Sequence, residues 1–176
     1  DSSKFKRRSS LILCPLERIT TVITDNGIRD EDRQMLETAR VSIDKAGLAA
    51  RITLVEGDAA DPVAVDRLRV SSFDRVFYSY TLSMIPIWRE ALAAGAARLG
   101  DGGRIHVVDF GQQERLPGWF RSLLFAWLSS FHVTPRADLE TVLQGLAQEA
   151  GAALEVRRLY RGYADYAVLR KQEFSG

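Results

Sequence analysis

The sequence predicts an α/β fold in which a mainly parallel sheet ends in an antiparallel hairpin. Helical and strand-like hydrophobic periods alternate from about Glu31 onward, as is typical of strands joined by crossover helices. The last two strand-like segments, 153–159 and 163–170, are joined by a turn too short for a parallel crossover, so we expect them to pair antiparallel at the sheet edge. With 176 residues, of which 46% are apolar, the chain is large enough for one domain with a sizeable core.

The first elements of this pattern are a helix and a strand. One helical face collects the apolar side chains of Met35, Leu36, Ala39, Ile43 and Ala46. Gly47 follows as the residue that ends the helix, because glycine adopts the left-handed conformation without strain. A strand over 51–56 comes next. Asp61 and Pro62 then predict the start of a short helix, and 73–79 is the following strand.

The second half of the pattern begins with a helix at Pro86. Its apolar face consists of Trp88, Ala91, Leu92, Gly95, Ala96 and Leu99. The Gly-Asp-Gly-Gly stretch at 100–103 predicts a turn into a buried strand over 104–110, which is rich in β-branched residues. The Thr-Pro pair at 134–135 predicts the start of the last helix, and Gly151 its end.

The first 29 residues do not join this pattern. Leu11–Cys14 and Thr20–Thr24 both have strand-like composition, but the five residues between them are too few for a parallel crossover. Residues 1–10 have the polar and basic composition of a solvated arm. The predicted organisation is an atypical, partly disordered segment over 1–29, an α/β domain over 30–171 and a tail over 172–176.

Composition argues against several classes of function. The formal net charge of +1 provides no general field for a polyanion, so we expect no nucleic-acid partner. The single cysteine, Cys14, and the two histidines do not form a zinc-binding set, so no metal is predicted. No stretch reaches the ~20 apolar residues of a membrane-spanning helix. Because a single cysteine cannot form an internal disulfide, we expect a reducing compartment and thus a cytoplasmic protein, either free or associated with a membrane surface.

The residues that follow the predicted strands form the candidate site, because ligands of an open α/β sheet bind outside the carboxyl ends of its strands. Residues 56–59 follow the first strand, and the carboxylate of Asp58 is suited to accept a hydrogen bond from an exocyclic amine such as adenine N6. A loop of hydroxyls and a thioether, 79–86, follows the second strand. Asp109, Phe110 and Gly111 follow the third.

Seven blocks of sequence at these positions form a recognisable series. They are Met35–Arg40, Val55–Ala59, Phe73–Val76, Tyr78–Pro86, Gly102–Gly111, Phe131–Arg136 and Leu159–Tyr163. The series resembles the class I S-adenosylmethionine-dependent methyltransferases, most closely the betaine-lipid type that methylates the amino group of diacylglyceryl homoserine. The first two blocks are generic to the class, whereas the loop over 78–86 and the segment over 132–136 are specific to this type. The resemblance covers 34–170.

The resemblance implies a Rossmann-like fold and S-adenosylmethionine as cofactor. It implies that Asp30 binds the ribose of the cofactor, with Asp25 as the alternative because it follows a strand-like segment. It further implies contacts of Asp58 and Ala59 with the adenine and a place for Ser79 along the cofactor cavity.

The methyl acceptor that the resemblance implies is an amine-bearing lipid. Aromatic faces attract quaternary ammonium groups, so Tyr80 and Tyr163 are predicted to line the acceptor site. His132 lies in the specific segment and is predicted to accept a proton or contact the headgroup. The catalytic candidates are therefore Tyr80, His132 and Tyr163. Other aromatic candidates are Tyr78, Tyr160 and Trp88.

Three polar side chains have alternative interpretations. Asp109 either caps the turn that follows its strand or contacts the substrate. Arg136 is able to pair with a phosphate or a carboxylate, of which a betaine-lipid headgroup offers only the carboxylate. His106 lies in the middle of a strand, where a packed, hydrogen-bonded imidazole is the more common case.

The apolar segment Leu116–Phe131 also has two interpretations. It contains two tryptophans and three phenylalanines, and Arg121 is its one charged residue. One interpretation is a helix buried against the sheet. The other is a helix that lies in a bilayer interface, with its rings at the depth of the headgroups.

The chain departs from the family in one respect. The family binds its cofactor with a Gly-x-Gly-x-Gly loop after the first strand, but this sequence has a single glycine, Gly27, before Gly47. The alternative function is therefore a non-catalytic remnant of the fold that binds a lipid or a partner. A nucleotide-dependent oxidoreductase is disfavoured, because its phosphate-binding loop needs the same glycines.

Overall fold

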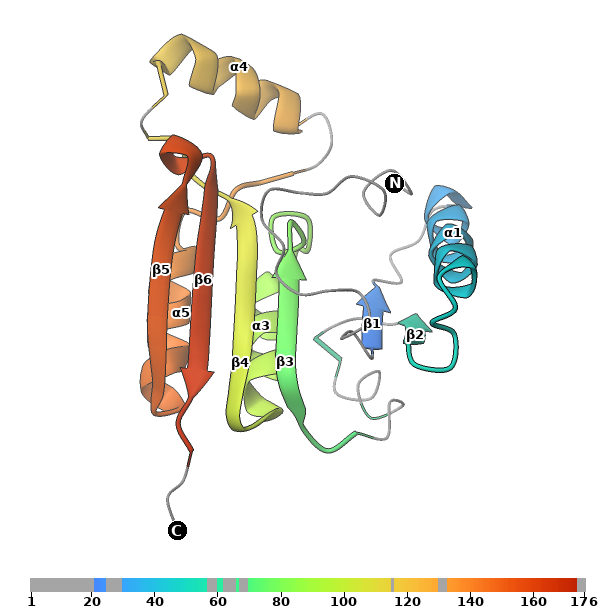
Figure 1. Cartoon of the computed structure of the whole chain (residues 1–176). Helices are drawn as coiled ribbons and strands as arrows, with labels where there is room; N and C mark the ends of the chain where they lie inside the picture. Colours follow the sequence, from blue (N-terminus) through green and yellow to red (C-terminus); the bar gives the residue numbers. More distant parts are fainter. Residues whose placement is uncertain are drawn as a thin grey trace. The chain divides into compact units, whose positions relative to one another are not determined.

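The computed structural model of the chain describes residues 21–24, 30–56, 60–61, 66, 70–114, 116–129 and 133–173. The chain divides into two units, Asp1–Val70 and Ser71–Gly176, and its elements are drawn in Figure 1. The strand expected at Leu11–Cys14 and most of the short helix expected after Asp61 lie outside the described residues. The predicted domain boundaries stay predictions.

The first unit contains a β–α–β element. Strand β1 (Thr21–Thr24) pairs in parallel with β2 (Thr53–Glu56), and helix α1 (Asp30–Lys45) lies between them in the sequence. The predicted strand at 20–24 is thus present, and it joins the α/β pattern that we expected to begin later. The physical reason is that α1 supplies the crossover of a dozen or more residues that parallel neighbours need.

Helix α1 ends at Lys45, just before Gly47, as the sequence predicts. Gly47 has a φ of +69°, its N–H donates to the carbonyl of Asp44, and the N–H of Leu48 donates to the carbonyl of Ile43. These two bonds form a Schellman motif, in which a left-handed residue lets the chain turn back and satisfy the last helical carbonyls.

The second unit is built on a four-stranded sheet. Its strands are β3 (Phe73–Ser79), β4 (Leu99–Phe110), β5 (Ala152–Leu159) and β6 (Ala164–Lys171), in the spatial order β3-β4-β6-β5. The pair β3–β4 is parallel, whereas β6 is antiparallel to both β4 and β5. The predicted parallel sheet with a final antiparallel hairpin is therefore confirmed.

Two helices cover one face of this sheet, α3 (Trp88–Ala97) and α5 (Leu139–Glu149) (Figure 1). They bury apolar side chains against the strands, and each fully buried aliphatic residue contributes about 1.5–3 kcal/mol. The buried set includes Trp88, Ala91, Leu92, Leu139, Leu143, Ala147, Ile105, Val107, Ala167 and Leu169. The face of α3 thus agrees with the prediction up to Leu92.

Tyr78 belongs to this core. Its side chain is buried, and its hydroxyl donates to the carbonyl of Ala91 in α3 at 2.6 Å. Burial raises the pKa of the Tyr78 phenol well above its usual value. Since adjacent residues of a strand point to opposite faces, Tyr78 faces the helices and does not line an acceptor site.

The structure corrects two predicted boundaries. Leu99 belongs to β4, not to the preceding helix, and 100–103 forms an irregularity within β4, where the register moves from Phe73–Leu99 to Arg75–Arg104. Helix α5 begins at Leu139, not after the Thr-Pro pair at 134–135. Residues 133–136 are not helical; the N–H of Thr134 donates to the carbonyl of Ser83 in the loop after β3 at 2.9 Å, and Arg136 binds the same loop.

Candidate functional site

The ends of several strands meet at one edge of the sheet of the second unit. The carboxyl ends of the parallel strands β3 and β4 lie beside the turn between β5 and β6, which contains the short 3-10 helix η3 (Tyr160–Gly162). We call this side of the sheet the carboxyl edge.

Backbone strain is concentrated at the carboxyl edge. Among the described residues, four non-glycine residues have a positive φ: Tyr80, Gln113, Tyr160 and Arg161, with values from 51° to 60°. Tyr80 follows β3, Gln113 follows β4, and the other two lie in the turn between β5 and β6. Such conformations cost free energy and gather at functional sites, so the strain marks this edge as the candidate site.

Three aromatic side chains meet at this edge. The ring centroid of Phe110 lies 4.8 Å from that of Tyr80, at an interplanar angle of 56°. It lies 5.8 Å from that of Tyr163, in an edge-to-face arrangement at 82°. These three residues are called the aromatic cluster below. The structure thus brings together Tyr80 and Tyr163, two of the predicted catalytic residues, through the ring of Phe110, which the sequence analysis placed in the candidate site without a role.

Tyr80, the member of the aromatic cluster that follows β3, is held as a neutral phenol. Burial raises the pKa of Tyr80, and the neighbouring Tyr163 and Asp109 raise it further. Its backbone N–H donates to the carbonyl of Val108 at 2.7 Å, which fixes the residue against β4. The side chain therefore offers a ring face and a hydroxyl without charge.

Asp109 caps the loop after β3. Its carboxylate is buried and accepts hydrogen bonds from the N–H of Ser83 at 2.9 Å and from the N–H of Phe110 at 2.7 Å. Burial raises the pKa of Asp109, and the hydrogen bonds oppose this shift. Of the two interpretations of this residue, the structure therefore favours the cap.

Arg136 holds the same loop from the other side. Its Nε donates to the carbonyl of Leu82 at 3.0 Å, and its Nη2 donates to the carbonyl of Ile85 at 2.8 Å. Its guanidinium carbon lies 5.8 Å from the ring centroid of Trp88. The guanidinium thus binds backbone carbonyls and not the headgroup carboxylate that the sequence analysis expected. Through these bonds Arg136 positions the loop that begins with Tyr80.

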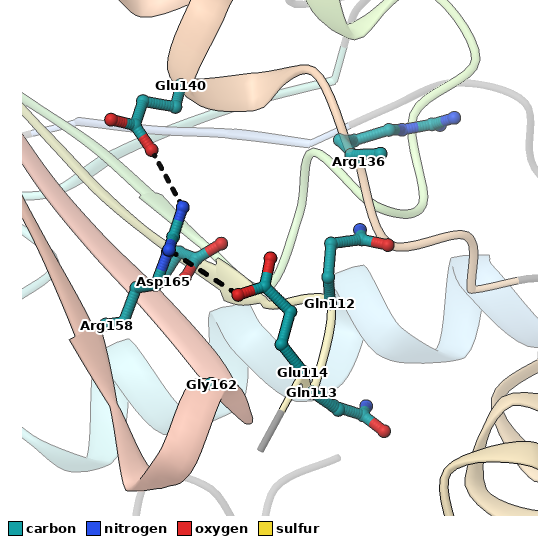
Figure 2. A pocket seen from close by; sticks show the side chains of 9 residues that line it. Gln112, Gln113, Glu114, Arg136, Glu140, Arg158, Gly162 and Asp165 are labelled. Carbon is teal, nitrogen blue, oxygen red and sulfur yellow. Dashed lines mark hydrogen bonds and ion pairs between the residues drawn. The ribbon is translucent and has the colours of Figure 1, made fainter. Parts of the chain in front are cut away.

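A small cavity lies beside these residues on the helix-covered face (Figure 2). Arg158 pairs there with Glu114 at 3.5 Å and with Glu140 at 3.2 Å. Asp165 lines the same cavity, and its pKa is raised mainly by burial. The cavity has a volume of about 40 Å³, room for about one water molecule, so it is too small for a methyl acceptor.

The other predicted site residues are only partly described. Ser79 is the exposed last residue of β3, and its carbonyl accepts a hydrogen bond from Thr81 Oγ1 at 3.0 Å. Asp30 is the first residue of α1, in the first unit. Asp58, Ala59 and His132 lie outside the described residues, so their roles stay predictions.

His106 is a packed residue, in agreement with its expected role. Its ring stacks on that of Phe77 at 5.0 Å, and its Nδ1 lies 3.3 Å from the hydroxyl of Tyr166. Burial and the nearby Arg75 and Arg104 lower the pKa of the imidazole.

Gly111 is required by the close approach of two backbones at the carboxyl edge. Its N–H donates to the carbonyl of Tyr163 at 2.9 Å, and a Cβ there would overlap the carbonyl oxygen of Gly162. We expect Gly111→Ala to lower the free energy of unfolding by about 2 kcal/mol. The control is Gly145→Ala in α5, where a Cβ meets open space, and it should raise that free energy by about 0.5–1 kcal/mol. Chemical denaturation checks both, and an unchanged midpoint for Gly111→Ala would contradict the close approach.

The fold of the chain is that of known methyltransferases. An O-methyltransferase family protein from Burkholderia thailandensis is 16% identical, with a TM-score of 0.59 over 90% of this chain and 52% of its own. An O-methyltransferase family 2 protein from Planctomyces limnophilus, solved with apigenin, is 20% identical, with a TM-score of 0.57 over 86% and 42%. A protein from Galdieria sulphuraria named as a sarcosine dimethylglycine methyltransferase is 14% identical, with a TM-score of 0.58 over 87% and 70%.

At these identities the similarity concerns the fold. The chain spans about half the length, or less, of the first two of these proteins. No protein-family model matches the sequence, and no curated protein does. The similarity to these solved structures confirms the predicted α/β, Rossmann-like fold.

The described residues do not form a complete site for S-adenosylmethionine. Ser79 and Tyr80 stand at the end of β3, where the resemblance expects one wall of the cofactor cavity. The Gly-x-Gly-x-Gly turn is missing from the sequence before Gly47, and a Cβ on Gly47 itself would meet nothing within 4 Å. Since a cofactor cradle needs close backbone approach, Gly47 does not supply one.

Proposed function

We propose that the second unit forms the acceptor side of an S-adenosylmethionine-dependent methyltransferase, and that the acceptor is an amine on a lipid headgroup such as that of diacylglyceryl homoserine. The observation that carries the proposal is the aromatic cluster of Tyr80, Phe110 and Tyr163 at the carboxyl edge. The methyltransferase fold of the chain and the sequence resemblance support the reaction class.

The chemistry of the cluster suits a cationic product. An amine that gains methyl groups becomes a quaternary ammonium, which cannot donate hydrogen bonds but is attracted to aromatic faces. Tyr80 stays a neutral phenol, because burial and its neighbours raise its pKa. Asp109 already accepts two backbone hydrogen bonds, so its role is to fix the loop and not to bind the headgroup.

The structural neighbours are named for two kinds of acceptor. Two belong to O-methyltransferase families, and one is named for sarcosine and dimethylglycine, which are amines. Methylation of a phenol needs a base for the hydroxyl proton, whereas a deprotonated amine is itself a nucleophile. The aromatic cluster favours the amine, and His132 stays the predicted proton acceptor.

A methyl-transfer assay with several acceptors tests this proposal. The chain is incubated with labelled S-adenosylmethionine at millimolar concentration and with diacylglyceryl homoserine in micelles, sarcosine or apigenin. We expect label in the amine lipid. Label in apigenin alone would replace the proposal with O-methylation. No label with any acceptor would favour the non-catalytic remnant of the fold.

The two tyrosines of the cluster should respond differently to two kinds of substitution. Tyr80→Ala and Tyr163→Ala remove a ring face and should lower kcat/KM for the amine about tenfold, whereas Tyr80→Phe and Tyr163→Phe should lower it less than about threefold. Tyr166→Phe, which lies beside His106 in the sheet, is the control and should leave kcat/KM unchanged. If phenylalanine is as harmful as alanine, the tyrosine acts through its hydroxyl and not through its ring.

A further inference from the structure

Exposed apolar side chains of the second unit gather at the carboxyl edge. Its exposed large apolar residues, among those described, all lie between β3 and α3, in the helix after β4 or in the turn between β5 and β6. We call this set the apolar edge: Met84, Ile87, Trp119, Leu123, Trp127 and Tyr160. Contiguous exposed apolar surface commonly marks an interaction site.

Helix α4 (Gly118–Ser129) carries half of the apolar edge. Trp119, Leu123 and Trp127 are spaced four residues apart, so they form one stripe, and their exposed fractions are 73%, 63% and 55%. Leu128 lies on the opposite side of the helix and is 1% exposed. The helix thus has one face toward the protein and one apolar face toward solvent. One interpretation of this segment was a helix buried against the sheet. The exposure of the stripe shows that these three side chains are not part of the core.

The chemistry of this stripe fits a bilayer interface. Tryptophan is enriched at the depth of lipid headgroups, where its ring is buried and its indole N–H meets polar groups. At 12 residues, α4 is too short to cross a bilayer, and no described helix is long and apolar enough to do so. An interfacial helix of this kind lies along the surface.

The charges of the apolar edge favour an anionic surface. Helix α4 contains no acidic residue, and its one charged residue, Arg121, is exposed on the side of the helix away from the stripe. Arg161 is exposed in the turn beside Tyr160. Each basic side chain near an anionic membrane contributes attraction that decays within a Debye length. The stripe of α4 alone, two Trp and one Leu, offers less area than the ~800 Å² per partner of a stable interface, so a second copy would also have to cover the rest of the apolar edge.

The aromatic cluster and the apolar edge lie on the same side of the sheet. Tyr160 belongs to the turn that leads to Tyr163, and Met84 belongs to the loop that begins with Tyr80. We propose that the apolar edge docks on the surface of an anionic lipid bilayer, so that the acceptor amine reaches the aromatic cluster from a membrane lipid. This inference rests on the proposed function and names how its substrate is presented.

Vesicle binding of the full chain tests the inference. The probes are phosphatidylcholine vesicles with and without phosphatidylglycerol, and bound protein is measured by flotation. Trp119→Ser combined with Trp127→Ser should lower the partition coefficient about tenfold or more. Val41→Ser combined with Val70→Ser is the matched control, since both valines are exposed in the first unit, and it should bind as the parent does.

A charge variant gives a second, independent readout. Arg161→Glu replaces an exposed side chain beside Tyr160 of the apolar edge and should weaken binding to phosphatidylglycerol vesicles about fivefold or more, with little change on pure phosphatidylcholine. If the double tryptophan variant unfolds at a lower temperature than the parent, the charge variant decides whether the apolar edge binds the bilayer. Equal vesicle binding by the parent and by a folded tryptophan variant, or an absence of binding by the parent, would overturn the inference.

The remaining outcomes separate this inference from the proposed function. The parent protein could self-associate while the tryptophan variant does not. That result would make the apolar edge an interface between copies and would overturn the proposal that it docks on a bilayer. Choline, a soluble quaternary ammonium compound, is titrated into the same protein as a probe of the aromatic cluster alone. If vesicle binding fails while choline still binds, the docking inference falls and the proposed acceptor stands. If vesicles bind and choline does not, the proposed function is wrong.

Discussion

S-Adenosylhomocysteine is expected to bind this chain with a dissociation constant in the millimolar range. The sequence has a single glycine, Gly27, before Gly47, so the turn that brings backbone N–H donors to the carboxypropyl arm is missing. Losing two or three hydrogen bonds of about 1–3 kcal/mol each, some of them to a charged carboxylate, weakens binding on the order of a thousandfold. A micromolar ligand thereby becomes a millimolar one.

Titration calorimetry measures this affinity directly. Choline titrated into the same sample is the control, because its binding would show that the acceptor side is intact. A micromolar dissociation constant for S-adenosylhomocysteine would mean that Asp25, Gly27 and Asp30 build a cradle of another kind. The variants Asp25→Ala and Asp30→Ala would then show which carboxylate binds the ribose.

The second large effect is expected at Asp109. Asp109→Ala leaves the N–H groups of Ser83 and Phe110 without their acceptor, and each buried donor that loses its partner costs about 1–3 kcal/mol. We expect the free energy of unfolding of the second unit to fall by about 3 kcal/mol, which lowers Tm by roughly 10 °C or more. The loop that begins with Tyr80 loses its cap as well, so choline binding should weaken in parallel.

A matched control separates the cap from the mere loss of a carboxylate. Asp138 is exposed and paired with Arg89, so Asp138→Ala should leave the midpoint of thermal unfolding nearly unchanged. If Asp109→Ala melts at the temperature of the parent, the carboxylate does not hold the loop.

The pKa of Asp109 also fixes the sign of a pH effect. Burial raises the pKa of this carboxyl in the folded state, so the folded protein binds its proton more tightly than the unfolded chain does. The contribution of Asp109 to the free energy of unfolding is therefore largest below the unfolded pKa and decreases as the pH rises through the folded pKa. The difference in Tm between the parent and Asp109→Ala should accordingly decrease from acidic to neutral pH.

Local sequence patterns predicted most of the fold of the second unit. Alternating periods identified its strands, and the short turn before Tyr163 required the antiparallel hairpin. Gly47 in the first unit was recognised as a helix stop because its role depends on its own backbone. The bulge within β4 was missed, because a turn and an irregular strand share the same glycine-rich composition.

The candidate site was predicted only in part, because its geometry depends on contacts between distant residues. Tyr80 and Tyr163 were found through the resemblance, whereas Phe110 joins them only once β4 is placed between β3 and β6. Arg136 binds carbonyls 54 and 51 residues away, which no local pattern reveals. The signal that pointed to Phe110 was its place at the carboxyl end of a strand, beside Asp109.

A comparison of two ligands of equal shape tests the central claim that the aromatic cluster binds a cationic amine product. Choline and 3,3-dimethylbutan-1-ol differ by a positive nitrogen in place of a neutral carbon, so the difference in their affinities isolates the attraction of charge to aromatic faces. Both are titrated into the chain while the ring protons of Tyr80, Phe110 and Tyr163 are followed by NMR. We expect choline to shift these signals and to bind about tenfold more tightly than the neutral alcohol. Equal affinities, or shifts confined to other residues, would contradict the account.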